Sequence, residues 1–258
     1  MASSTSTDAA QQQQQQQQPP LKITGRTFDA FHSPRLTYRA AEESPEHEAF
    51  IRSMLSDTEG RSGASYRLTT TSTKATAQKY LKESQDDLLC AIIYLKPSLP
   101  STDDNNVTAT DVAAAPGPAG EKEKEPVPIG VVTLNANGDS AHSSYWAQHR
   151  GAFLSIDIVR DYRGKGYGGE AIEWALGFAF RMANMHRVSL TTFSYNGGAM
   201  RLYRKLGFVQ EGSQREDVWF NGGWHDCVLY GMLEDEWRAR QEGAERKWGG
   251  VRCVRGSK

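Results

Sequence analysis

The chain has 258 residues, enough for one domain with extra segments or for two small domains. Its formal net charge of −1 excludes a global electrostatic attraction to nucleic acid or to an anionic membrane, so we expect neither as a partner. The three cysteines are odd in number and widely spaced, which predicts reduced thiols and no metal site. No apolar run reaches membrane-spanning length and no secretion signal opens the sequence. We therefore expect a cytoplasmic protein, with the nucleus left open.

Residues 1–21 are rich in Ser and Thr and contain eight consecutive glutamines. Such a segment cannot bury enough apolar surface to offset its conformational entropy, and we expect a disordered tail. A weak association through the glutamine tract and a merely solvated tail both remain open. The folded domain is expected to span residues 34–238.

The first elements alternate between strand and helix patterns. Leu36–Arg39 reads as a strand, and Glu46–Leu55 as a helix that Ser44 and Pro45 open as N-cap and first residue. Ala75–Glu83 is a second candidate helix.

Two apolar runs, Leu88–Leu95 and Ile129–Leu134, are expected to pair as a hairpin. Between them, residues 97–128 are rich in Pro, Ala, Gly, Ser and charge. Because closing a longer loop costs little extra entropy, we interpret them as a disordered insertion rather than a second domain.

A glycine-rich turn then joins a strand to a helix. Residues 153–159 form an apolar run, and Glu170–Met185 shows the spacing of a helix with one buried stripe. Glycines in the turn allow a close backbone approach, and the first N–H groups of a helix attract anions. The turn supplies Gly164, Gly166 and Gly168, with charge from Arg160, Arg163 and Lys165. This arrangement is typical of a diphosphate site, although a tight connection with solvated charges remains an alternative.

Two common phosphate motifs do not fit. A P-loop needs Ser or Thr after the lysine, but Gly166 follows Lys165. A dinucleotide fingerprint expects an acidic residue at the end of the next strand, and Arg187–Phe193 ends without a carboxylate.

A second motif decides between these interpretations. The pattern RxxGxG at 163–168, followed by NxxAxxLYxKLGF at 196–208, resembles the GNAT superfamily of N-acetyltransferases. Residues 208–233 are similar to the closing strands of the branch that holds the spermidine and the ribosomal-protein alanine acetyltransferases.

The resemblance implies an α+β fold with a mixed, mostly antiparallel central sheet flanked by helices. The fourth and fifth strands of this fold splay into a V. It implies acetyl-CoA as cosubstrate and transfer of its acetyl group to a primary amine, either a small amine such as a polyamine or a protein amine. A non-catalytic acyl-CoA-binding regulatory or scaffold module is the alternative, and a homodimer is left open.

The resemblance also assigns residues. Tyr203 matches the general acid beside the sulfur of CoA. Asp157 is the candidate base, although it could instead order a water or pair with an arginine while solvent takes the proton. The backbone of the fourth strand would bind the pantetheine arm, and Asn196 would contact the arm or cap its helix. The expected cofactor-binding residues are Ile158, Val159, Arg163, Gly164, Lys165, Gly166, Tyr167, Gly168 and Asn196.

In the family the region around the first helix covers the acceptor. Its carboxylates would attract a cationic amine or simply be solvated: Glu42, Glu43, Glu46, Glu48, Asp57 and Glu59. At the other end, Asp217–Phe220 and Asp226–Leu233 are expected to pair through an Asn221-Gly222 turn. Residues 239–258 are basic and are read as a tail or an interaction segment.

Overall fold

The computed structural model describes residues 28–58, 60, 63, 65–66, 71–97, 126–136 and 148–247, with side chains as far as residue 242. The predicted tail at 1–21, residues 98–125 of the predicted insertion and residues 248–258 lie outside the described residues.

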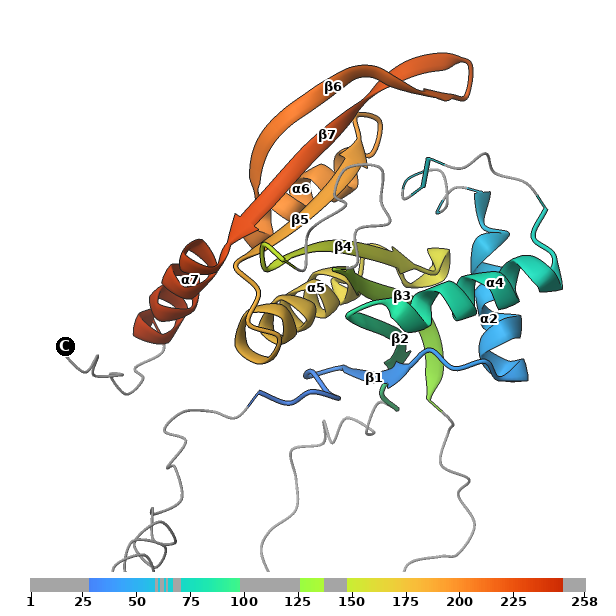
Figure 1. Cartoon of the computed structure of the whole chain (residues 1–258), viewed down its shortest axis with the longest axis horizontal. Helices are drawn as coiled ribbons and strands as arrows, with labels where there is room; N and C mark the ends of the chain where they lie inside the picture. The colour runs from blue at the N-terminus through green and yellow to red at the C-terminus, as the bar shows by residue number, and fades with distance from the viewer. Residues whose placement is uncertain are drawn as a thin grey trace, which may run out of the picture.

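Seven strands form one sheet in the order β1-β2-β3-β4-β5-β7-β6 (Figure 1). Only β4 and β5 pair in parallel, and the other neighbours are antiparallel. The predicted mixed, mostly antiparallel α+β sheet is therefore confirmed. The strands are β1 (Leu36–Ala40), β2 (Leu89–Leu95), β3 (Val127–Asn135), β4 (Gly151–Ile158), β5 (Arg187–Phe193), β6 (Val209–Phe220) and β7 (Gly223–Leu233).

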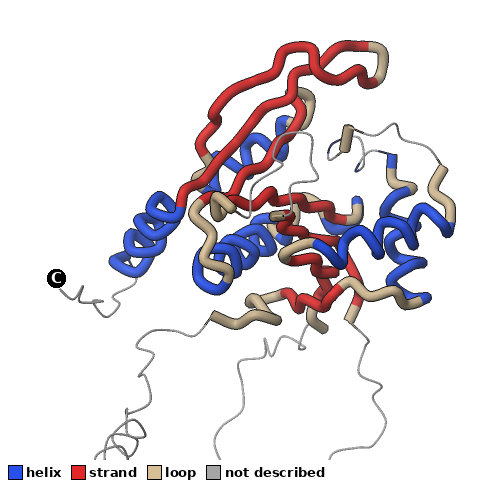
Figure 2. The backbone as a smooth tube through the Cα atoms, in the orientation of Figure 1, coloured by secondary structure: helices blue, strands red, loops and turns tan. Residues whose placement is uncertain are grey.

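Helices cover both faces of the sheet (Figures 1 and 2). They are α2 (Pro45–Leu55), α4 (Lys74–Glu83), α5 (Tyr167–Gly177), α6 (Gly197–Leu206) and α7 (Glu234–Lys247), with short helical turns η2 (Ser84–Asp86), η3 (Arg160–Tyr162) and η4 (Phe178–Met182). Alternate residues of β2 show the two layers. Ala91 and Ile93 are buried in the cluster that contains α5 and α6, whereas Ile92 and Tyr94 are buried with α2 and α4. Burial on both faces explains why β2 and β3 are almost continuously apolar in sequence.

Local sequence signals act as predicted at two places. Ser44 caps α2 by accepting the N–H of His47 at 3.2 Å. Asn221 and Gly222 both adopt left-handed backbone angles, with φ of 47° and 84°, and make the turn between β6 and β7.

The β6–β7 hairpin is longer than predicted. β6 begins at Val209 rather than Asp217, and β7 at Gly223 rather than Asp226. The first half of β6 is the exposed edge of the sheet, so its side chains are mostly polar and give no apolar alternation to read.

The last helix also extends past a predicted boundary. α7 runs to Lys247, so the expected start of the tail at residue 239 falls inside it. Trp237 anchors this helix, because its buried ring lies 5.4 Å from that of Phe180. None of the helices in the described ranges combines the length and apolar character that crossing a membrane requires.

The close approach of β3 and β4 gives a testable constraint on the sheet. A Cβ added at Gly130 would lie 2.4 Å from the backbone oxygen of Asp157, which cannot move without disturbing β4. We expect Gly130→Ala to lower the free energy of unfolding by about 1–3 kcal/mol in urea denaturation. Gly212→Ala in β6 is the matched control, because nothing lies within 4 Å of its added Cβ. Equal midpoints for the two variants would contradict this reading of the sheet.

Candidate active site

The parallel strands β4 and β5 run side by side over a short stretch only. Residues 151–153 of β4 pair with residues 187–189 of β5. Beyond them, β4 pairs with β3 as far as Ile158, and β5 pairs with β7 as far as Phe193. The facing edges therefore separate and open a V in the sheet, which confirms the predicted splay.

A cavity of about 1130 Å³ occupies this opening. Its walls include β4 and β5, the turn that leads into α5, the first residues of α5 and α6, Ser56–Thr58 after α2, and the tip of the β6–β7 hairpin. Typical ligand pockets measure about 300–1,000 Å³, so the space suits a large ligand or two ligands together.

The backbone of β4 turns hydrogen-bonding groups toward the V. The N–H of Val159 donates to Ile129 of β3 at 2.9 Å, and its carbonyl accepts from the N–H three residues later, also at 2.9 Å. Residues of an antiparallel strand alternate between bonding the neighbour and facing away, so Ile156 and Ile158 face the opening. Both backbone groups of Val159 thus have protein partners, whereas Ile156, which the sequence analysis did not name, faces the opening.

Two kinds of glycine occur in the turn before α5. Gly164 and Gly166 have φ of 73° and 84°, a left-handed conformation that strains other residues. Gly168 is different, because a Cβ there would meet Ile158 and Leu202 only at 3.7 and 3.8 Å, an ordinary contact distance. The protein itself could hold a methyl group at 168. Because residue 168 is a glycine, the space that a methyl group would fill belongs to the cavity, which Gly168 lines.

The start of α5 is positively polarised. The N–H of Glu170 makes the first intrahelical bond, to the carbonyl of Gly166 at 3.2 Å, so the N–H groups of residues 167–169 precede the bonded turn. Lys165 is exposed beside them, with its Nζ 5.4 Å from the ring centre of Tyr162. Amides and a cation at a helix start make an anion site.

Arg163 takes a position that the motif did not predict. Its Nη2 lies 2.6 Å from Oδ2 of Asp57 and 3.6 Å from Oδ1 of Asp157, and its Nε donates to the carbonyl of Ile158 at 2.7 Å. The guanidinium therefore links the glycine-rich turn to the segment after α2. Asp57 and Arg163 are 106 residues apart, and no local signal in the sequence pairs them.

Two predicted residues on or beside α6 line the cavity. Asn196 caps the helix, since its Oδ1 accepts the N–H of Ala199 at 3.1 Å, and its Nδ2 donates to the carbonyl of Gly63 at 3.3 Å. Tyr203 is 8% exposed and lines the same cavity. Burial raises the pKa of Tyr203 to about 12, and the neighbouring Tyr230 adds to the shift. The phenol therefore keeps its proton at neutral pH.

The opposite end of the cavity is aromatic. The ring of Tyr195 stacks on Phe220 at 4.8 Å and on Phe193 at 5.4 Å, with the edge of His225 at 4.8 Å. The sequence analysis missed this wall, because its rings come from β5, the turn after it and the two strands of the hairpin. Among the described residues, no group of three His, Cys, Asp or Glu side chains is arranged to hold a metal ion.

Comparison with known proteins agrees with this geometry. Residues 91–208 match the Acetyltransferase (GNAT) family. The chain carries a GNAT acetyltransferase domain. The matched range of this GNAT domain runs from β2 through α6, and so includes the V, the glycine-rich turn and Tyr203.

Curated relatives of the GNAT domain are acetyltransferases by name. The spermidine N(1)-acetyltransferase of Vibrio cholerae is 33% identical over 94 residues, which are 36% of this chain and 54% of that protein. An uncharacterized N-acetyltransferase of the SPbeta prophage of Bacillus subtilis is 35% identical over 81 residues, 31% of this chain and 46% of the relative. The chain thus spans about half the length of the curated relatives it matches.

Solved structures resemble the chain over a longer range. The crystal structure of the Vibrio cholerae spermidine N-acetyltransferase, in complex with CoA and spermine, superposes with a TM-score of 0.58. It covers 80% of this chain and 99% of its own, at 20% identity. At that identity the likeness establishes the fold.

The raised pKa of Tyr203 predicts how stability responds to alkali. The unfolded tyrosine titrates near pH 10, so between pH 10 and 12 the unfolded chain loses this proton first and is favoured as pH rises. Between pH 9 and 11 we expect the wild-type protein to lose about 1 kcal/mol more unfolding free energy than Tyr203→Phe. Urea denaturation at both pH values measures this, and the other tyrosines, common to both proteins, cancel. Equal losses would mean that Tyr203 is not buried as described.

Proposed function

We propose that this GNAT domain is an acetyl-CoA-dependent N-acetyltransferase that acetylates a primary amine. One observation carries the proposal. A single cavity runs from the anion site at the start of α5, along the open edge of β4, to the protonated hydroxyl of Tyr203. A diphosphate, an amide-bearing arm and a thioester are the chemical groups that these three regions suit, in that order.

The proposal assigns the binding of the cosubstrate to residues around the V. The N–H groups of residues 167–169 would bind the diphosphate, and the ammonium of Lys165 adds positive charge beside the same turn. The backbone groups of Ile156 and the N–H of Ile158, which face the opening, would extend the sheet onto the amides of the pantetheine arm, while the carbonyl of Ile158 is bonded to Arg163. The missing side chain of Gly168 leaves the arm its space.

The chemistry then needs a leaving-group acid. Acetyl-CoA supplies the acetyl group as a thioester. The neutral amine attacks the carbonyl carbon, a C–N bond forms and the C–S bond breaks. Tyr203 donates its proton to the departing sulfur and is reprotonated by the proton that the amine gives up.

Asp157 stays a candidate proton acceptor on the other side of the reaction. It lies on β4 in the cavity wall, on the side of the 56–58 segment, and shares Arg163 with Asp57. A carboxylate that a guanidinium already holds is suited to order a water or to position the turn. Through that water the ammonium form of the acceptor loses to solvent the proton that it must shed before attack, and the proton released after attack is the one that returns to Tyr203.

The acceptor is proposed to be a cationic amine that enters between the 56–58 segment and the hairpin tip. Asp57 and Asp157 put two carboxylates on that side, where both contact the guanidinium of Arg163. A polyamine is the first acceptor to test, because the similar protein from Vibrio cholerae is named a spermidine acetyltransferase.

Thiol release from acetyl-CoA in the presence of polyamines, aminoglycosides and N-terminal peptides tests the proposal. We expect turnover with at least one amine, and Tyr203→Phe should lower kcat by about 10²-fold, because it removes the acid but keeps the ring.

Tyr230→Phe is the matched control. This neighbouring hydroxyl is fully buried and has no hydrogen-bond partner among the described residues, so its loss should leave kcat nearly unchanged. Saturable CoA binding without acylation of any amine would favour a non-catalytic acyl-CoA-binding module. An unchanged kcat in Tyr203→Phe would remove this tyrosine from the mechanism.

A further inference from the structure

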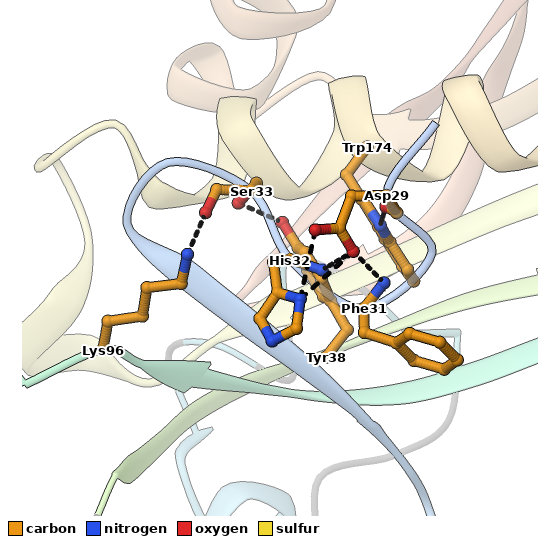
Figure 3. Close-up of polar contacts among 7 residues, drawn as sticks. All are labelled: Asp29, Phe31, His32, Ser33, Tyr38, Lys96 and Trp174. Carbon is orange, nitrogen blue, oxygen red and sulfur yellow. Dashed lines mark hydrogen bonds and ion pairs between the residues drawn. The ribbon is translucent and has the colours of Figure 1, made fainter. Parts of the chain in front are cut away.

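The segment before β1, residues 28–35, lies along α5 and is called here the N-terminal strap. The indole N–H of Trp174 donates to the carbonyl of Asp29 at 3.1 Å, and the ring of Tyr38 stacks on Trp174 at 3.7 Å (Figure 3). The carboxylate of Asp29 accepts the N–H groups of Phe31 and His32 and so closes a turn within the strap (Figure 3). These contacts give the strap a defined path beside α5.

Further contacts fix the end of the strap. Lys96 donates to the carbonyl of Ser33 at 2.7 Å (Figure 3). Glu170, in the first turn of α5, accepts the hydroxyl of Ser33 at 2.6 Å and both the N–H and the Nε of Arg35 at 2.7 Å. Burial alone would raise the pKa of Glu170, but these hydrogen bonds outweigh it and lower the pKa. The carboxylate is therefore ionised and holds Arg35 in one orientation.

The guanidinium of Arg35 lies against the glycine-rich turn. Its Nη1 donates to the carbonyl of Lys165 at 3.1 Å, and its Cζ stands 4.6 Å above the ring centre of Tyr167. Its Nη2 would be 3.3 Å from a Cβ at Gly166 and has no partner among the described residues. One edge of the guanidinium thus keeps its donors available at the tip of the turn.

The position of the Arg35 guanidinium determines which phosphate of CoA it can reach. Gly164 and Gly166 line the cavity, whereas Arg35 and Lys165 do not. CoA carries its diphosphate between the arm and the nucleoside, and a separate phosphate on the 3′ oxygen of the ribose. A diphosphate held by the helix start leaves the nucleoside end outside the cavity.

We propose that Arg35, together with Lys165, binds the 3′-phosphate of CoA and makes the enzyme prefer CoA over dephospho-CoA. The assignment rests on the proposed function, because it needs the diphosphate to occupy the start of α5. An arginine held by contacts to its other nitrogens loses little freedom when it binds a phosphate, and its planar donors match phosphate oxygens.

Calorimetric titration of the full chain with acetyl-CoA and with acetyl-dephospho-CoA tests the assignment. The wild-type protein should bind acetyl-CoA more tightly. Arg35→Gln should weaken acetyl-CoA binding about 10-fold, which is the loss of one charge-assisted contact at an exposed site, and change acetyl-dephospho-CoA binding by less than about 2-fold.

Arg39→Gln is the matched control. Arg39 is also an exposed arginine of the same region, but its guanidinium lies over the ring of Tyr94, away from the turn. It should leave both affinities unchanged.

The outcomes separate the assignment from the proposed function. Equal weakening of both ligands in Arg35→Gln would show that the residue acts through the turn or the diphosphate, and would overturn the assignment. So would unchanged binding of both ligands. A wild-type protein that is folded and binds neither ligand would instead remove the proposed function, and this assignment with it.

Discussion

The site depends on hydrogen bonds that the sheet leaves unmade. β4 and β5 pair over only three residues each and then part, so the second half of β4 is bonded on one edge and open on the other. Backbone groups that are withdrawn from water without a partner cost about 1–3 kcal/mol each. An open edge inside a cavity therefore has to be satisfied by water, by a side chain or by a ligand. At Ile158 the carbonyl already has Arg163, whereas the remaining groups face the space in which a second strand would have lain.

How far sequence can predict such a site depends on how local the cause is. The cap at Ser44 and the Asn221-Gly222 turn are set by residues a few positions apart, and the structure has them as predicted. The glycine-rich connection is equally local, although α5 begins at Tyr167 rather than at the predicted Glu170 and ends at Gly177 rather than at Met185. The choice between Ile156 and Val159 is different. It depends on which residues of β4 bond to β3, and that parity belongs to the register between the two strands, which neither strand's own sequence shows. The aromatic wall around Tyr195 likewise exists only after three segments have come together.

The positions of charged side chains are even harder to predict from the sequence. A motif assigns a cation to the turn because it is adjacent in sequence, but adjacency does not fix the direction of a long side chain. Arg163 leaves the turn and joins Asp57, where two carboxylates and the carbonyl of Ile158 offer better partners than solvent. Arg35 comes to the turn from 130 residues away in the chain, because the strap and Glu170 bring it there. Arg35 thus takes the place beside the turn that the motif predicts for Arg163.

The negative charge of Glu170 lies at the anion site itself. Glu170 lies in the first turn of α5, where a carboxylate interacts well with the helix dipole but would repel a phosphate bound at the same helix start. With Arg35 bonded to it, the pair is neutral, and the unused edge of the guanidinium lies at the turn. The carboxylate thus serves as the anchor that holds a cation beside the turn. A glutamine at 170 would keep part of the hydrogen bonding and remove the repulsion, but it would hold the guanidinium less firmly, since charge-assisted bonds are about twice as strong as neutral ones. A carboxylate at this position is therefore compatible with phosphate binding only as long as the strap is in place.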